Sequence, residues 1–158
     1  MNNWTADVQT LLGQSKVCFL ATQGQNGPET SMAPYAIHNA TILLHLSKLA
    51  RHTTNIENSP AIGLMICTPE KSADSPLALP RLSLQGRVTP VSEKEFESAK
   101  SAYLKTIPDA EPLFSFADFS LFQLIPSAIH WVGGFGSARN IAVSDWRALF
   151  AENEGEMP

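Results

Sequence analysis

The sequence predicts a mainly β (α+β) protein, a six-stranded antiparallel barrel with short helices at its periphery. Three observations support this fold class. Six segments are short and rich in aliphatic residues, most of them are joined through turns, and no regular strand–helix alternation is present. With 158 residues the chain is long enough for one domain with a sizeable core, spanning 1–158, and residues 151–158 are expected to form a frayed tail.

The first part of the chain predicts a short helix over 7–14, followed by a β-hairpin. Apolar residues over 16–22 form the first expected strand, and the second covers 29–37 after an Asn-Gly turn at 26–27. Pro34 interrupts the second strand because proline has no N–H to donate to a neighbouring strand. We therefore expect an edge, a bulge or a bound group beside the backbone at this position.

Two buried strands, 42–46 and 61–67, enclose a segment that predicts a helix with Ser47 as its N-cap. Its apolar stripe contains Leu49, Thr53 and Ile56, and its opposite side carries Lys48, Arg51, His52 and Asn55. A helix N-terminus with a hydroxyl and several basic groups is suited to an anion such as a phosphate. The alternative is a solvated basic face that binds nothing.

The second half of the chain predicts a half-buried strand over 81–91, because apolar and polar residues alternate there. A capping box at Ser92 begins a helix that ends at Pro108. Two further strands are expected on either side of Pro126, and a last helix over 144–150. Between the main helix and these strands lie four aromatic residues, which predict core or interface packing: Phe114, Phe116, Phe119 and Phe122.

Composition excludes several classes of function. Eleven basic and fifteen acidic residues give a net charge of −4, which argues against nucleic-acid binding. No apolar run is long enough for a membrane span, and Cys18 and Cys67 are expected to be buried thiols of a cytoplasmic protein. The four histidines do not show metal-site spacing, and no nucleophile motif is present. If the protein is an enzyme, a cofactor should carry the reaction, and no catalytic side chain can be assigned.

Two passages resemble a known family. They are residues 46–60, Leu-Ser-Lys-Leu-Ala-Arg-His-Thr-Thr-Asn-Ile-Glu-Asn-Ser-Pro, and residues 132–138, Val-Gly-Gly-Phe-Gly-Ser-Ala, with 81–88 as a weaker third. With these passages the chain resembles the FMN-binding split-barrel family, whose best-known member is pyridoxamine 5′-phosphate oxidase. It is most similar to the haem-utilisation branch of that family. The resemblance implies a split barrel that pairs as a homodimer, with FMN, or alternatively haem, in the groove between subunits.

The resemblance also implies a set of cofactor-binding residues. Strand residues Met32, Ala33, Pro34 and Tyr35 would pass along the flavin ring. Ser47, Lys48, Arg51, His52 and Thr53 would lie near the phosphate, Arg81 would contact the flavin, and Trp131 would cover the ring from the partner subunit. The implied function is a flavin-dependent oxidoreductase acting on an unknown small molecule. The alternative is a haem- or flavin-binding protein without turnover.

Overall fold

A computed structural model describes residues 3–71, 75–134 and 136–151. The expected tail therefore lies outside the described residues, apart from Ala151, which ends the last helix. The elements in chain order are α1 (Trp4–Gln14), β1 (Val17–Gly24), β2 (Gly27–Pro34), β3 (Ala36–His38), β4 (Thr41–Ser47), α2 (Arg51–Asn58), β5 (Ala61–Cys67), η1 (Pro76–Ala78), β6 (Arg81–Pro90), α3 (Glu93–Thr106), η2 (Pro108–Ser115), β7 (Phe119–Val132), β8 (Ala138–Ile141) and α4 (Val143–Ala151).

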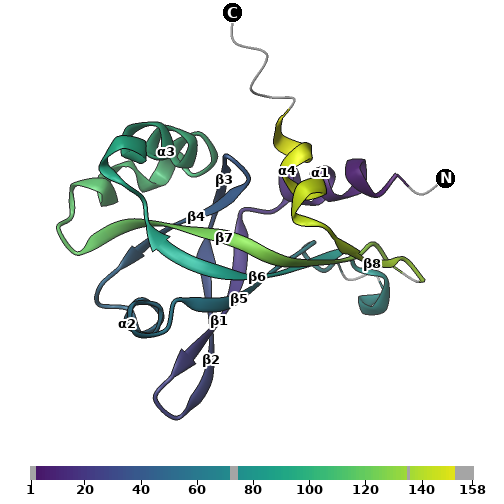
Figure 1. The fold of residues 1–158 in the computed structure, drawn as a ribbon, viewed down its shortest axis with the longest axis horizontal. Coiled ribbons are helices and arrows are strands. Elements are labelled where there is room, and N and C mark those ends of the chain that lie inside the picture. Colours follow the sequence, from purple (N-terminus) through teal and green to yellow (C-terminus); the bar gives the residue numbers. More distant parts are fainter. Residues whose placement is uncertain (1–2, 72–74, 135, 152–158) are drawn as a thin grey trace, which may run out of the picture.

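One antiparallel sheet curls into the barrel, with the strand order β2-β1-β5-β6-β7-β4-β3 (Figure 1). Its two end strands, β2 and β3, follow one another in the chain and are separated only by Tyr35. They are the two halves of the single strand predicted over 29–37, divided directly after Pro34. The described sheet has eight strands because of this division and because the short β8 adds to β7. The fold class expected from the sequence is confirmed.

Strand β7 corrects the prediction of two strands on either side of Pro126. It runs without a break from Phe119 to Val132 and pairs with both β4 and β6. The register with β6 shifts between Gln85 and Gly86, where Pro126 lies opposite Gly86. A side chain at Gly86 would collide with the carbonyl oxygen of Ile125. The irregularity expected of a strand proline is therefore accommodated by a glycine on the neighbouring strand.

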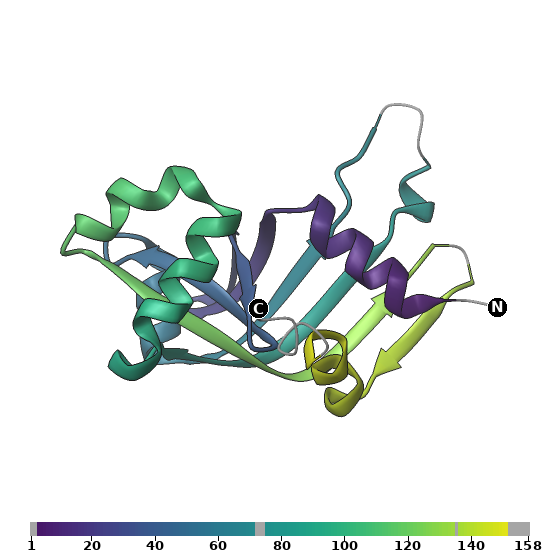
Figure 2. The same ribbon diagram turned by 90° about the horizontal axis from the view of Figure 1, so that it is seen from above.

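The core has two parts, and the helices α3 and η2, which cover the smaller part, lie at the end of the molecule away from α1 (Figure 2). The larger part fills the barrel and includes Trp131 and Trp146. The smaller part lies where α3 and η2 pack on β3 and β4, and it includes Leu43 and Tyr103. The predicted alternation of β6 is confirmed, since Leu82, Leu84, Gly86 and Val88 are all buried. None of the described helices is long and apolar enough to cross a bilayer.

The aromatic segment is divided between the two parts of the core, with Phe122 in the larger part and Phe114 packed against the smaller one. Phe122 is buried, and Phe114 and Phe119 pack around His45, whereas Phe116 is 52% exposed. Other side chains offer the exposed apolar surface. Phe19 pairs across strands with Met32 on β2 and with Met65 on β5, and all three are at least 39% exposed. We call Phe19, Met32 and Met65 the apolar strip.

Candidate functional site

Helix α2 begins later than the sequence predicted. Its first residue is Arg51, Ala50 occupies the N-cap position, and no side chain caps the helix. Ser47 instead ends β4, and its Oγ accepts from the backbone N–H of Leu49. Leu49 is 87% exposed, so the buried stripe of α2 contains only Thr53 and Ile56. The chain therefore turns once between β4 and α2, and this turn leaves Arg51 at the very start of the helix.

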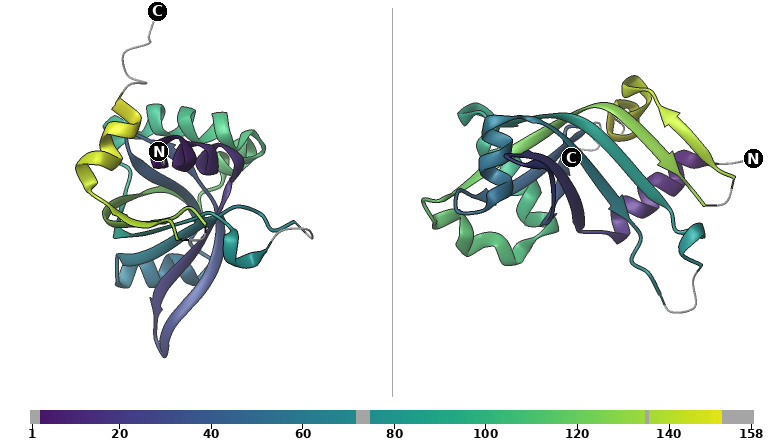
Figure 3. Two further views of the ribbon diagram at one scale, coloured as in Figure 1. Left: turned by 90° about the vertical axis from the view of Figure 1, so that its right-hand side faces the viewer. Right: turned by 90° about the horizontal axis from the view of Figure 1, so that it is seen from below.

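Arg51 lies against the hairpin of β1 and β2, which projects beside α2 (Figure 3). Its Nη2 forms an ion pair with Oε2 of Glu29, which is on β2. Asn55, one turn further along α2, donates from Nδ2 to Oε1 of Glu29 at 2.7 Å and to Oγ1 of Thr22 at 3.1 Å. Helix and hairpin are thus joined by a polar cluster in which both oxygens of one carboxylate have donors.

His52 contributes the second functional group of this cluster. Its Nδ1 lies 2.9 Å from Oγ of Ser31, two residues after Glu29 on the same face of β2. Burial lowers the pKa of His52 below its ordinary value of 6.5, so the imidazole is neutral at pH 7. With Nδ1 engaged by Ser31, Nε2 is the ring nitrogen left to meet a ligand. A neutral imidazole held through one nitrogen is a common arrangement for a metal-binding histidine.

A groove of ≈ 490 Å³ runs over this cluster, lined by Thr22, Glu29, Thr30, Ser31, Arg51, His52 and Asn55. It follows β2, the strand at one end of the sheet order. The groove therefore offers one exposed cation, one neutral imidazole and the backbone at the end of a sheet. Such a combination suits a ligand that carries both an anionic group and a flat ring along an open strand.

Three residues predicted to lie near an anion instead form hydrogen bonds that stabilise the turn between β4 and α2. Ser47 donates from Oγ to Oδ2 of Asp118 at 2.8 Å, and the backbone N–H of Lys48 donates to the carbonyl of Asp118 at 2.7 Å. Thr53 is fully buried and donates from Oγ1 to the carbonyl of Ser47 at 2.6 Å. None of Ser47, Lys48 and Thr53 is among the residues that line the groove. Their contacts fix the direction in which α2 leaves the sheet.

The strand residues predicted to follow the flavin ring alternate between two faces. Met32 and Pro34 are exposed, whereas Ala33 and Tyr35 are buried in the barrel. Burial raises the pKa of Tyr35 to about 12, so its hydroxyl stays protonated. Only the first pair has side chains that can meet a ligand or a partner. Ala33 and Tyr35 can contribute no more than their backbone.

The structure places Arg81 and Trp131 apart from the groove. Arg81 begins β6 at the end opposite to Arg87, and the six residue steps from one to the other span about 20 Å of strand. Its Nη1 donates to the carbonyl of Leu79 at 3.1 Å. Trp131 lies across from Leu82 and is 1% exposed, so its side chain belongs to the core of its own subunit. Neither Arg81 nor Trp131 is among the residues that line the groove with Arg51 and His52.

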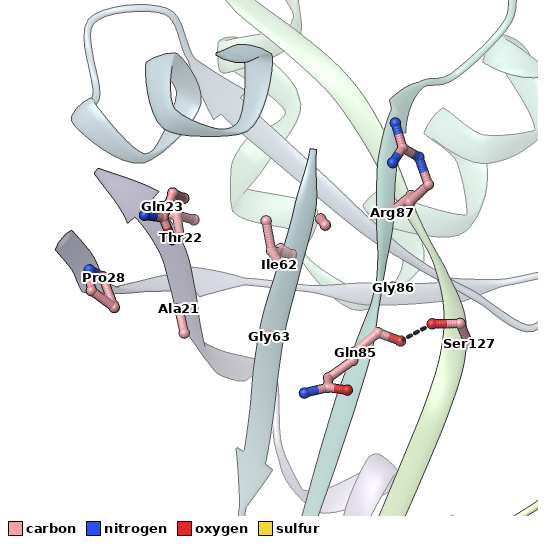
Figure 4. A pocket seen from close by; sticks show the side chains of 11 residues that line it. Ala21, Thr22, Gln23, Pro28, Ile62, Gly63, Gln85, Gly86, Arg87 and Ser127 are labelled. Carbon is pink, nitrogen blue, oxygen red and sulfur yellow. Dashed lines mark hydrogen bonds between the residues drawn. The ribbon is translucent and has the colours of Figure 1, made fainter. Parts of the chain in front are cut away.

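A second hollow lies on the outer face of β1, β5, β6 and β7 (Figure 4). It contains Arg87 and Gln85 from β6 and Ser127 from β7, and Oγ of Ser127 donates to the carbonyl of Gln85 at 3.2 Å. Arg87 is exposed and belongs to the end of β6 that pairs with Ala61, just after α2. This arginine, rather than Arg81, is the β6 cation nearer to the groove.

Sequence reasoning missed the groove residues of the hairpin, namely Thr22, Glu29, Thr30 and Ser31. A local signal existed for two of them, since Glu29 and Ser31 are polar residues spaced by two on the strand face that leads to buried Ala33 and Tyr35. Arg51 and Asn55 have the i, i+4 spacing of one helix face. No local signal showed that this strand face and this helix face meet. That contact depends on how α2 folds back onto the hairpin.

Comparison with known proteins gives a family match over most of the chain. The family model described as "CREG, beta-barrel" matches residues 13–148. The chain is 31% identical over 137 residues to the non-canonical heme oxygenase HOZ, chloroplastic, of Arabidopsis thaliana, covering 84% of this chain and 41% of that protein. It is 27% identical over 146 residues to the heme oxygenase HutZ of Vibrio cholerae, covering 88% of this chain and 81% of that one.

A solved structure agrees with the sequence comparison. The heme binding protein from Mycobacterium smegmatis superposes with a TM-score of 0.84 at 26% identity, covering 94% of this chain and 61% of that chain. This chain thus spans less than two thirds of the length of the plant protein and of the mycobacterial one. The resemblance to split-barrel proteins, with haem-utilisation proteins among the relatives, is confirmed.

Proposed function

Because the chain belongs to the CREG β-barrel family, we propose that it is a haem-binding protein whose ligand lies in the groove between α2 and β2. The observation that carries this proposal is the adjacent placement of Arg51 and His52 on that groove. Haem needs a ligand for its iron and cationic partners for its two propionates. Arg51 supplies the cation, and His52 supplies a neutral imidazole whose Nδ1 is already engaged by Ser31.

The roles of the side chains follow from this donor set. Nε2 of His52 would hold the iron, and Ser31 would keep the imidazole in the required orientation. Arg51 would meet a propionate of the bound haem. Bound haem would supply one-electron and oxygen chemistry. The chain's own residues would bind and orient it.

A titration with haem tests this function. We expect the purified protein to develop a Soret band near ~400 nm as haem is added, which is a property of the bound cofactor. His52→Ala should weaken binding and change the band, since it removes the nitrogen proposed to bind the iron. His130→Ala is the matched control, because His130 is an exposed histidine on β7, outside the groove. A normal haem complex of His52→Ala, or no band with the wild-type protein, would contradict the proposal.

An FMN-dependent oxidoreductase is the second candidate. The observation that favours it is the exposed guanidinium of Arg51 at the start of a helix, which suits a phosphate as well as a propionate. An absorption band near ~450 nm that remains with the protein through gel filtration would favour flavin. Its substrate would be a small molecule that the groove does not identify. Haem remains the first candidate because the plant and Vibrio relatives are heme oxygenases and the mycobacterial relative is a heme binding protein.

We also propose a homodimer that packs through the apolar strip. Phe19, Met32 and Met65 expose three large side chains in one cross-strand row, which is unusual for the face of a sheet that meets only water. Sedimentation at micromolar concentration should give about twice the 17.2 kDa of one chain, and Phe19→Glu should give a folded monomer. A wild-type protein that binds haem while sedimenting as a monomer would contradict this assembly.

A further inference from the structure

Glu29 occupies the position in the groove where an anionic ligand would meet its donors. Its carboxylate takes the ion pair of Arg51 on Oε2 and the amide hydrogen bond of Asn55 on Oε1. Arg51 is the only Lys or Arg among the residues that line the groove, and its side chain is 85% exposed. The side chain of Glu29 is 29% exposed, so the carboxylate lies partly within the groove wall.

The hairpin is shaped to hold this carboxylate. A Cβ added to Gly24 would lie 2.6 Å from Cδ, 2.7 Å from Cγ and 2.9 Å from Oε1 of Glu29. Because Gly24 is not in the left-handed backbone region, its own conformation does not require glycine there. A side chain at position 24 would instead meet the side chain of Glu29, which passes across Gly24 and would have to shift. Helix α2 thus contributes the two donors to the carboxylate of Glu29, and Gly24 of the hairpin leaves the space for its side chain.

We infer that Glu29 is a built-in competitor for the anionic group of the ligand, and that it lowers the groove's affinity for anions by holding Arg51. This inference rests on the proposed function of the groove as an anion-binding site. An incoming carboxylate or phosphate must either displace Glu29 from Arg51 or approach a second negative charge at close range. The pair itself adds little to stability, since an exposed ion pair contributes on average well under the energy of a buried one. The main effect of the ion pair between Glu29 and Arg51 is therefore on the groove's affinity for anionic ligands.

Two variants separate the charge of Glu29 from its position. Glu29→Gln keeps the shape and removes the charge. Gly24→Ala keeps the charge and forces the side chain of Glu29 away from its place between Arg51 and Asn55. Glu57→Gln is the matched control, because Glu57 is an exposed acid on the same helix that does not line the groove, and its loss changes the net charge by the same amount.

The experiment measures dissociation constants for haem, FMN and riboflavin with the wild type and the three variants. We expect Glu29→Gln to bind haem or FMN roughly 3- to 10-fold more tightly, because one exposed repulsive charge at close range is removed. Gly24→Ala should act in the same direction, riboflavin should respond to neither change, and Glu57→Gln should differ from wild type by less than about twofold. Haem and FMN report the two possible sources of the anion, a propionate and a phosphate.

The outcomes that overturn the inference are distinct from those that overturn the function. If Glu29→Gln and Gly24→Ala both bind haem and FMN no more tightly than the wild type does, Glu29 supports the groove rather than competes in it. An equal gain with Glu57→Gln would show a general charge effect and would also overturn the inference. If no ligand binds to the wild type or to any variant, the proposed function itself fails. If Glu29→Gln does not fold, the affinities of Gly24→Ala for haem and FMN decide whether Glu29 competes with the ligand.

Discussion

His45 is buried and His52 is partly buried, and the surroundings of the two histidines differ in kind. His52 lies on the groove at the start of α2, with Nδ1 engaged by Ser31 and a guanidinium next to it in the chain. His45 on β4 is 8% exposed and stacks on Phe114 at a centroid distance of 3.8 Å. Its Nδ1 has no hydrogen-bond partner among the described residues. Burial lowers the pKa of both rings.

This difference distinguishes the groove around His52, a candidate ligand site, from the surroundings of His45, which are part of the structural core. The groove contains polar groups held by other polar groups and remains open to solvent, which allows a ligand to replace one of those contacts. His45 is surrounded by Tyr103 of α3, Phe114 of η2 and Phe119 of β7, and these ring contacts offer no polar partner that a ligand could replace. A lowered histidine pKa therefore indicates a functional site here only together with an open, hydrogen-bonded environment.

The largest predicted effect that distinguishes the two regions is the pH dependence of the free energy of unfolding that His45 causes. Burial lowers the pKa of His45 to about 4 from 6.5, so between these values the unfolded chain binds a proton that the folded chain does not. The contribution of neutral His45 to stability is fully present above pH 6.5 and is lost as the pH falls toward 4. We expect the free energy of unfolding in urea to be about 1–2 kcal/mol lower at pH 5 than at pH 7.5 on account of this residue.

His45→Phe provides the comparison for this prediction. A phenyl ring can stack on Phe114 and cannot be protonated, so the variant should lose that part of the pH dependence and be the more stable protein at pH 5. Lys100 of α3, whose Nζ lies 5.3 Å from the ring centre of Phe114, is present in both proteins. His130→Gln, at an exposed site, should keep the wild-type dependence. Parallel pH profiles for wild type and His45→Phe would contradict our account of this region.

Much of the fold was predictable because its signals are local. The Asn-Gly turn predicted the hairpin, the alternation of Leu82, Leu84 and Val88 predicted β6, and the Ser92 capping box predicted α3, whose Ser92 Oγ accepts from the backbone N–H of Glu95. The start of α2 was predicted at Ser47 because a serine after an apolar strand is a common N-cap. In the structure Asp118, distant in sequence, binds that serine, and the helix begins at Arg51.

The candidate site was predictable only on the side that α2 contributes. Arg51 and His52 are adjacent in a recognisable motif, so the sequence could single them out. Glu29 lies 22 residues before Arg51, and nothing between them shows that the two will pair. The direction in which Trp131 points was equally hidden, since an aromatic residue in a strand can face the core or a ligand. Contacts of this kind depend on strand register and helix placement, which emerge only in the folded chain.

The smallest predicted effect tests the central claim most directly, namely that Arg51 holds an anionic group of the ligand. Wild type and Arg51→Ala are each titrated with haem and with haem dimethyl ester, whose carboxylates are blocked. Arg51→Ala should weaken haem binding by about 1 kcal/mol, less than a fully buried charged hydrogen bond because Arg51 is exposed and already paired with Glu29. The ester should bind both proteins equally, and Lys48→Ala, which removes an exposed cation outside the groove, should leave both ligands unaffected. Equal losses for haem and its ester, or no loss for either, would contradict the claim.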